Sequence, residues 1–293
     1  MTERLADIGS RITGIRQLGA VVNAMRGIAA ARAQQARGQL AAVDRYAATI
    51  AAAIAQALPL IPAGASAPIA RPGKPRLGLV LFCAEQGFAG AFSERVLDAA
   101  GPALHTAELF LIGTRGQTAL AERGIEAGWT GALPSHSPGI PKLADRITQA
   151  LYARIAAGKI DRLDAIYSHW QPSQGTHIER KHLLPFDMAA FAVPKSGSSS
   201  AKANPPMLYL RPEAVVQALT ADYMLAELCR GALHGFAAEN EARMEAMAAA
   251  RGQIERQLAT LQATQRRVRQ EEITAEIIEL ASGEAASRAR RSG

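Results

Sequence analysis

The sequence predicts an α/β protein with a long antiparallel coiled coil, in which N- and C-terminal helices flank a Rossmann-like α/β domain. Three observations lead to this fold class. Both ends of the chain have a helix-forming composition, apolar residues recur there every seven positions, and short apolar runs alternate with helical segments in between. We expect an N-terminal helix at 1–58, a linker at 59–75, a globular domain at 76–210, a C-terminal helix at 211–286 and a frayed tail at 287–293.

The N-terminal helix is expected over residues 3–58 because two apolar series with a seven-residue step lie on one side of it. The first series is Ile8, Ile15, Val22, Ala29, Ala36, Val43, Ile50 and Ala57. The companion series is Leu5, Ile12, Ala33, Leu40, Ala47 and Ile54. Gly19 and Arg26 interrupt the companion series, and we expect Leu18 and Met25 to shift the contact by one position there.

The C-terminal helix is expected from Pro212 because no proline follows and the composition favours helix at nearly every position. Its seven-residue series is Leu219, Ala226, Leu233, Asn240, Met247, Ile254, Leu261, Val268 and Ala275. Only Asn240 is polar. A repeat that stays at seven residues keeps one side of the helix facing one partner and implies a left-handed supercoil. About 70 helical residues span roughly 105 Å, more than a small domain needs, so we expect the rod itself to be the working part.

The C-terminal helix is longer than the N-terminal one by about 15 to 20 residues, or roughly 25 to 30 Å. Its far end carries aliphatic residues on more than one side, namely Ile273, Ile277, Ile278, Leu280 and Ala281. Such a surface is an aggregation hazard in water. We therefore expect another protein to cover it.

The middle of the chain contains apolar runs that lack alternation, as expected for strands buried on both faces. The expected strands are 76–83, 108–113 and 162–169. Helices are expected near 93–100, after Gly116 and near 140–157. Strands that alternate with helices predict a parallel sheet of modest size.

Two segments of low complexity border this domain. Pro59 and Pro62 end the first helix and open the linker, because proline cannot continue a helix. Residues 195–206 (KSGSSSAKANPP) are expected to form a flexible loop. Residues 207–210 are expected to form a last strand before the C-terminal helix.

The charge allows several classes of partner, and the composition disfavours two of them. A net charge of +7 and a pI near 9.8 would allow nucleic acid, an anionic membrane or an acidic protein as partner. No basic run is dense enough for a nucleic-acid footprint, and only 5% of the residues are aromatic. The most apolar stretch, 51–70, is broken by prolines, so no membrane span is expected. Cys83 and Cys229 have no metal-type spacing and are expected to be buried thiols in a reducing compartment.

A pair of glycines and a set of three histidines could each form a binding site or have an ordinary structural role. Gly87 and Gly90 follow a buried strand, where dinucleotide enzymes place their phosphate turn, but the full glycine pattern is absent. A structural tight turn is favoured and a nucleotide site is the alternative. His169, His177 and His182 are expected in one loop region, and their spacings of eight and five residues fit no standard zinc pattern. We expect no metal site.

No catalytic set is predicted, since Ser93 and Ser135 lack the surroundings of a nucleophile. Arg269 and Gln270 lie just before the aliphatic end of the C-terminal helix. They are either part of a solvated face or a polar contact with a partner, and composition does not decide between the two.

One motif combines residues 242–247 (ARMEAM), Arg269 with Gln270, and residues 273–276 (ITAE). In this highly specific motif the chain resembles the gamma subunit of F-type ATP synthases. Looser similarities are Ile8, Arg11 with Ile12, Ala24 with Met25, and the segments 85–90 (EQGFAG), 112–116 (IGTRG) and 183–185 (LLP). The similarity covers nearly the whole chain in order.

The chain departs from the family pattern at several positions. These are Gly9, Leu18, Val22, Asn23, Gln86 and Ala89. The departures affect the polar contacts of the N-terminal helix and indicate a divergent paralogue of the ordinary gamma subunit.

The resemblance implies a central rotor shaft that couples ion flow through a c ring to ATP synthesis or hydrolysis at beta subunits. It implies the alpha, beta and epsilon subunits and the c ring as partners, at the cytoplasmic side of a bacterial inner membrane. The implied contacts with alpha and beta subunits are Met25, Arg269, Gln270, Thr274, Glu276, Ile277 and Leu280. The resemblance implies no catalytic residue, cofactor or metal in this chain. The alternative is a coiled-coil scaffold with an α/β domain that binds a small molecule.

Overall fold

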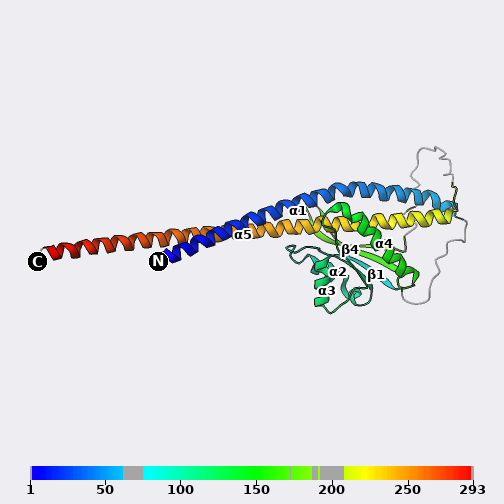
Figure 1. Ribbon diagram of the computed structural model, residues 1–293. Helices are drawn as coiled ribbons and strands as arrows, with labels where there is room; N and C mark the ends of the chain where they lie inside the picture. Colours follow the sequence, from blue (N-terminus) through cyan, green and yellow to red (C-terminus); the bar gives the residue numbers. More distant parts are fainter. Residues whose placement is uncertain (1, 62–74, 172, 187–190, 192–207, 292–293) are drawn as a thin grey trace. The chain divides into compact units, whose positions relative to one another are not determined.

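The structure is a computed structural model that describes residues 2–61, 75–171, 173–186, 191 and 208–291 (Figure 1). The chain divides into two compact units, one made of residues 1–28 and 244–293 and the other of residues 29–243. Among the described residues, no helix combines the length and the apolar character that crossing a membrane requires.

Each end of the chain forms one continuous helix, as predicted. Helix α1 spans Thr2–Ala57 and is followed by a 3-10 turn, Leu58–Leu60, where Pro59 stops the α-helix. Helix α5 spans Pro212–Arg291. It therefore continues past the expected end at Ala286, because no proline interrupts the Ala- and Arg-rich segment that follows Gly283.

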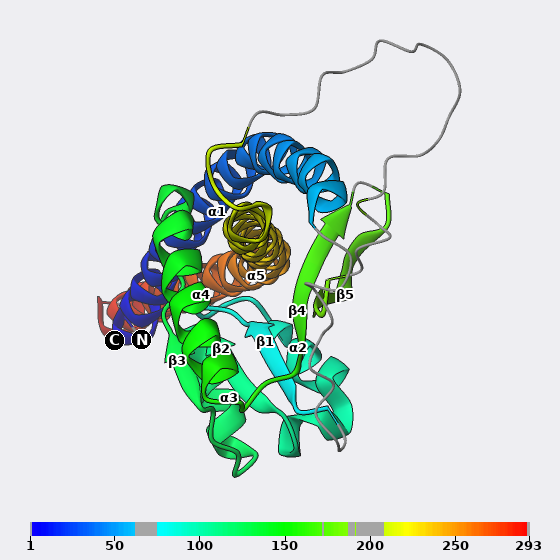
Figure 2. The ribbon, with the colours of Figure 1, turned by 90° about the vertical axis from the view of Figure 1, so that its right-hand side faces the viewer.

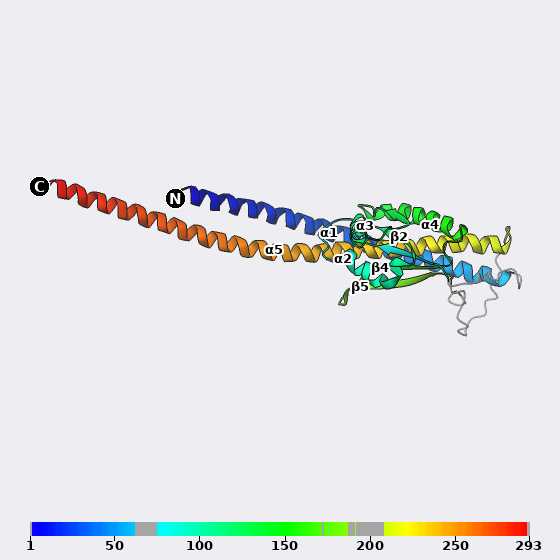
Figure 3. The same cartoon turned by 90° about the horizontal axis from the view of Figure 1, so that it is seen from below.

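In the unit made of residues 1–28 and 244–293, α1 and α5 pack through their seven-residue series (Figure 3). Ile8 and Ile12 form one cluster with Val268. Further along α1, Val22 packs with Met247 and Ile254. Low-numbered residues of α1 thus meet high-numbered residues of α5, so the two helices run antiparallel here.

The expected shift to Leu18 is wrong, whereas Met25 packs against the Val22 cluster as predicted. Leu18 is 52% exposed. A Cβ atom added to Gly19 would lie 3.4 Å from Cγ2 of Ile254. Gly19 therefore belongs to the contact stripe, where its missing side chain gives Ile254 room, and no shift in the contact is needed.

The middle of the chain folds into a five-stranded sheet in the order β3-β2-β1-β4-β5. The strands are β1 (Leu77–Phe82), β2 (Glu108–Ile112), β3 (Trp129–Gly131), β4 (Arg162–Gln171) and β5 (Gly175–Leu184). The pairs β1–β2, β1–β4 and β2–β3 are parallel, and β5 is antiparallel to β4. The parallel order 3-2-1-4 matches the first four strands of the doubly wound order 3-2-1-4-5-6, as the Rossmann-like prediction requires.

Three of the four predicted strands are confirmed as β1, β2 and β4, but β3 and β5 have no counterpart in the prediction. Strand β3 has only three residues, and β5 is polar at every position from Thr176 to His182 except Ile178, so it lacks an apolar run. His177 and His182, predicted in a loop region, lie instead on β5, whereas His169 lies on β4 at the end of the predicted strand 162–169. Of the expected strand at 207–210, the described residues 208–210 are not in a strand. Residues 62–74 of the expected linker and the expected loop 195–206 lie outside the described residues.

Helices cover both faces of the sheet (Figure 2). The shorter helices are α2 (Phe92–Ala100), α3 (Thr114–Glu122) and α4 (Ile140–Ala156), with 3-10 turns at Gly101–His105 and Ser137–Gly139. Leu79 and Leu81 point to the face covered by α2 and α3. Val80 and Phe82 point to the other face, which is covered by α4 and by the part of α5 around Leu228. Because successive strand residues alternate sides, a strand without polar alternation is buried on both.

Cys83 and Cys229 are both free and buried, as predicted. Burial raises the pKa of the Cys229 thiol to about 11. Both residues therefore serve as small apolar groups of the core.

One buried acid stabilises the pairing of β4 with β5. Asp164 is only 1% exposed. Its carboxylate lies 2.9 Å from Nδ1 of His182 and accepts hydrogen bonds from Arg180 and Arg162. Burial raises the pKa of Asp164, but the hydrogen bonds from these three residues outweigh burial, so its pKa is lowered overall.

We expect Asp164→Asn to lower the free energy of unfolding by about 1 to 3 kcal/mol at pH 7. A lowered folded pKa contributes stability above the unfolded value of about 3.9 and loses it as the pH falls through the folded value. The difference between wild type and variant should therefore shrink below about pH 4. Urea unfolding at pH 7 and pH 3 measures it. Asp98→Asn is the control, because Asp98 is largely exposed and should cost less than about 1 kcal/mol. An equal loss at both pH values would show that the carboxylate charge is not the cause.

Candidate interaction site and its buried polar support

A buried arginine on α5 binds the loop that follows β1. Arg243 is 5% exposed. Its Nε donates to the carbonyl oxygen of Gly87 at 3.1 Å, and its Nη2 donates to that of Gln86 at 3.2 Å. The same guanidinium donates to Oδ1 of Asn240 and to the carboxylate of Glu239. The planar fork of arginine allows one side chain to make all four bonds.

Glu239 binds the same loop through the loop's backbone N–H groups, whereas Arg243 binds the loop's carbonyl groups. Its carboxylate accepts the backbone N–H groups of Glu85 and Gln86, each at 3.1 Å. Residues 85–87 are therefore bound to α5 through both their amides and their carbonyls. Glu239 and Arg243 also form an ion pair with each other, which offsets the cost of burying two charges.

Asn240 explains the one polar break in the seven-residue series of α5. It is buried, and its Nδ2 donates to the carbonyl oxygen of Phe236 at 2.8 Å. Its Oδ1 accepts from Arg243 at 3.0 Å. Both polar ends are satisfied, so asparagine at this position orients the arginine instead of packing as an apolar residue would.

Glu85 extends this network to the far strands of the sheet. Its carboxylate accepts hydrogen bonds from the N–H and the hydroxyl of Thr114 and from the N–H of Leu133, at 2.7 to 3.1 Å. Thr114 begins α3, where a carboxylate is favoured by the unpaired amides of the helix. Three segments that the sequence analysis named separately, 85–90, 112–116 and the ARMEAM motif, therefore meet in one network.

Helix α1 joins the same network from its later part. Arg32 donates to Oε1 of Gln86 at 3.1 Å. Arg37 pairs with Glu241 of α5, and its guanidinium lies 3.8 Å from the ring centre of Trp170. These contacts use the planar and stacking properties that distinguish arginine from lysine.

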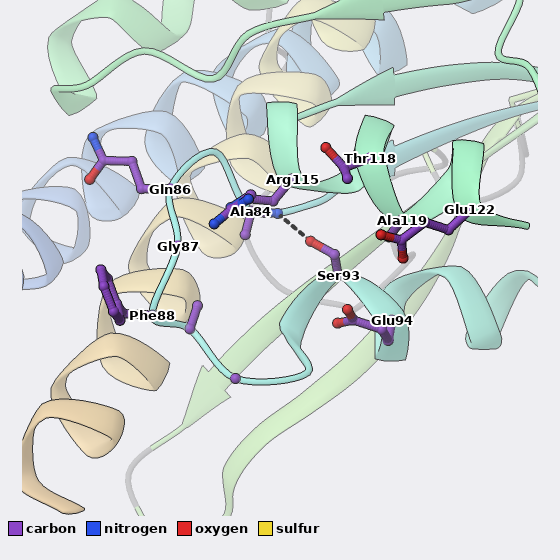
Figure 4. A pocket seen from close by; sticks show the side chains of 12 residues that line it. Ala84, Gln86, Gly87, Phe88, Ser93, Glu94, Arg115, Thr118, Ala119 and Glu122 are labelled. Atoms are coloured by element: carbon purple, nitrogen blue, oxygen red, sulfur yellow. Dashed lines mark hydrogen bonds between the residues drawn. The ribbon is translucent and has the colours of Figure 1, made fainter. Parts of the chain in front are cut away.

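The glycine turn after β1 borders a hollow of about 250 Å³ (Figure 4). Gly90 has a φ of 57°, and Oγ of Ser93 accepts the N–H of Ala84 at 3.2 Å. The hollow is lined by Arg115 but also by Glu94 and Glu122, whose carboxylates repel a phosphate. The arrangement favours the structural tight turn over a nucleotide site. The hydroxyl of Ser93 contributes to the conformation of this turn.

The predicted partner contacts on α5 are exposed, as a docking surface requires. They are Arg269, Gln270, Thr274, Glu276, Ile277 and Leu280. Leu280 is 75% exposed, and the nearby Ile273 and Ile278 are also more than half exposed. Thr274 donates its hydroxyl to the carbonyl oxygen of Gln270 within the helix.

Met25 lies apart from these residues. It is half-buried and packs beside Met247, about 20 residues before Arg269 along α5, or roughly 30 Å. The structure therefore gathers six of the seven predicted contacts at one end of α5 and leaves Met25 at another level of the helix pair.

Sequence reasoning missed the conformation of Phe88, which is exposed and has a φ of 62°, unusual for a bulky residue. It named His169 and His177 but missed that they lie opposite each other on paired strands. The first feature depends on the conformation of a loop and the second on strand register, so neither had a clear signal in the sequence.

Comparison with known proteins identifies the family. A family model described as ATP synthase matches residues 4–286. The ATP synthase gamma chain of Rhodospirillum rubrum is 27% identical over 298 residues, covering 95% of this chain and 98% of that protein. That of Parafrankia sp. is 26% identical, with 97% of each chain covered. This chain belongs to the F-type ATP synthase gamma subunit family.

Solved structures share the fold of this family member. One chain of the Euglena gracilis mitochondrial ATP synthase, in a structure of OSCP, F1 and c-ring, matches with a TM-score of 0.66 and 13% identity. That match covers 100% of this chain and 97% of the other. A chain from the central stalk and c-ring of the Tetrahymena thermophila mitochondrial ATP synthase matches with a TM-score of 0.56 and 16% identity, covering 78% of this chain and 99% of the other.

We expect Arg243→Ala to lower the free energy of unfolding by about 3 to 5 kcal/mol, because it leaves the Glu239 carboxylate buried without its ion-pair partner. Arg243→Lys should lose less, since a charge remains but the fork geometry does not. Chemical denaturation of the full chain measures both. Arg251→Ala is the matched control on α5, where the arginine is exposed and pairs with Glu255, and should cost less than about 0.5 kcal/mol. Similar losses for Arg243→Ala and Arg251→Ala would contradict a structural role for the buried network.

Proposed function

We propose that this chain is the central rotor shaft of an F-type ATP synthase and couples ion flow through the c ring to ATP synthesis or hydrolysis at the beta subunits. The observation that carries the proposal is the family match over residues 4–286, together with gamma chain relatives that align over nearly their whole length. The shared fold with chains from structures titled central stalk and rotor agrees with it.

The pairing of α1 with α5 supports a shaft. We propose that these helices form an antiparallel coiled coil from residues 1–58 and 211–286. Residues 76–210 then form the separate α/β domain. The clusters around Val268 and Val22 draw on the seven-residue series that such a supercoil needs. A coiled coil resists bending and twisting, which a shaft that transmits rotation requires.

The exposed end of α5 supports a bearing inside a ring of other subunits. Aliphatic side chains make no directional bonds, so they can slide past similar residues with little preference for any angle. Burial of this surface still contributes about 25 cal/mol per Å² removed from water. We propose that alpha and beta subunits surround this end and contact Arg269, Gln270, Thr274, Glu276, Ile277 and Leu280, with Met25 as a separate contact.

The remaining partners follow from the same proposal. The α/β domain would contact the epsilon subunit and the c ring, at the cytoplasmic side of a bacterial inner membrane. The chain would carry no catalytic residue, and its asymmetry would impose different conformations on the three beta subunits as it turns. The scaffold alternative lacks support, because the family match leaves no long segment of the chain unassigned. Co-purification separates the two, since a rotor subunit should be isolated with alpha and beta subunits.

We expect Arg269→Ala combined with Gln270→Ala to lower the ATPase rate or the coupling of the assembled complex without unfolding this chain. Both side chains are exposed, so their loss removes a contact with a partner and no contact of the core. Arginine offers the fork geometry that suits a carboxylate on that partner. The assay compares ATP hydrolysis and ion pumping in reconstituted vesicles. The matched control changes Gln265 and Arg266, one turn earlier, to Ala. Unchanged turnover and coupling in the first variant would remove the pair from the mechanism.

We expect truncation after Gln270 to weaken assembly and to make the isolated chain more soluble, because it removes the exposed isoleucines and Leu280. Any complex that assembles should keep part of its ATPase activity. A full-length control with Ser at Ile273, Ile277, Ile278 and Leu280 separates lost length from lost apolar surface. Complete loss of hydrolysis in a fully assembled truncated complex would mean that this end takes a direct part in catalysis.

A further inference from the structure

Strands β4 and β5 place two histidines and a glutamate on one face of the sheet. In the antiparallel register, His169 lies opposite His177, and Tyr167 lies opposite Glu179. Residues two apart on a strand share a face, so His177 and Glu179 point the same way as His169. Directly opposed residues have Cβ atoms about 4.5 to 5.5 Å apart, and diagonal neighbours such as His169 and Glu179 remain within reach of long side chains.

The possible ligand atoms of these three side chains converge. One ring nitrogen of each histidine and one carboxylate oxygen of Glu179 all lie within 4.8 Å of one another. Nδ1 of His169 is 3.3 Å from Oε2 of Glu179, and the rings of His169 and His177 have centroids 4.9 Å apart. The ligand atoms of a tetrahedral zinc ion lie about 3.3 to 3.5 Å apart, given metal–ligand distances near 2.0 to 2.2 Å. One pair already has this separation.

A ring nitrogen of His177 lacks a partner in the described part of the chain. Its Nδ1 is buried and makes no hydrogen bond to any residue that the structure describes. A buried polar atom left unpaired costs about 1 to 3 kcal/mol. An ion bound to that nitrogen would remove the cost.

The surrounding charges leave Glu179 available for a cation. Lys181, two residues further along β5, pairs with Glu227 at 2.6 Å. Arg230 pairs with Glu227 at 3.1 Å and with Asp44 at 2.9 Å. The nearby positive groups are thus balanced by other acids.

The neighbouring side chains also orient the ligands. Tyr167 lies opposite Glu179 on the paired strand. His234 of α5 packs against His169, with ring centroids 4.0 Å apart. Such supporting contacts hold metal ligands in place in known sites.

We propose that His169, His177 and Glu179 bind one zinc ion, with a fourth position open to water. Two imidazoles and a carboxylate are a donor set that zinc accepts in proteins. The ion would link β4 to the edge strand β5 beneath α5 and stabilise their pairing. The inference concerns residues 167–179 and does not rest on the proposed rotor function.

The test uses the full chain without a histidine tag, after removal of metals by a chelator. Zinc titration by calorimetry should give one ion per chain, and cobalt as a probe should produce visible absorption of a tetrahedral site. His177→Ala and Glu179→Gln should each weaken zinc binding roughly tenfold or more. Zinc should raise the thermal unfolding temperature of the wild type more than that of either variant, because only a ligand bound to the folded state stabilises it.

The control is His136→Ala, which removes an exposed histidine on another element and should leave zinc binding unchanged. Circular dichroism checks that each variant folds, and His177→Gln replaces His177→Ala if the latter does not. Absence of stoichiometric binding would overturn the proposal. The proposal would also fail if Glu179→Gln and a folded His177 variant both bound zinc with wild-type affinity. It would fail as well if His136→Ala weakened zinc binding as much as these variants do.

Discussion

The ion pair between Arg243 and Glu239 is the interaction on which the α/β unit most depends. Both side chains are almost fully buried on α5, and between them they bind both kinds of backbone group in residues 85–87. Burying two charges is costly, so the arrangement is favourable only because nearly every donor and acceptor has a partner. The loop after β1 therefore has its conformation set by α5, and Glu85 passes that constraint to the start of α3 and to Leu133.

The two surfaces of α5 follow opposite physical rules. Near Arg243 its polar groups are buried and individually satisfied, which gives a unique geometry. Near Ile277 and Leu280 its aliphatic side chains are exposed among polar ones such as Glu276, and the aliphatic side chains themselves make no directional bonds. In the function proposed above, a shaft held at one place and turning at another would use both surfaces, and both lie on one continuous helix.

Strand β5 is the most polar element of the sheet, and its polar residues form two separate groups. His182 and Arg180 bind Asp164, the buried acid of β4. His177 and Glu179 meet His169 on the other side of the same strand pair. Alternation along the strands separates the groups, so the edge of the sheet combines a stabilising ion cluster with a site of suitable chemistry for a metal.

The sequence by itself determined the two terminal helices, the strands β1, β2 and β4, and the exposed end of α5. These features depend on local composition and on the seven-residue period, which the chain carries without reference to distant residues. Only the tertiary structure decided the rest. It showed that Gly19 belongs to the helix contact because Ile254 approaches it, that Asn240 orients Arg243, and that the histidines lie on paired strands instead of a loop. Each of these roles depends on how segments far apart in the sequence align with one another. The local sequence does not specify that alignment, so it cannot show which partner a side chain will meet.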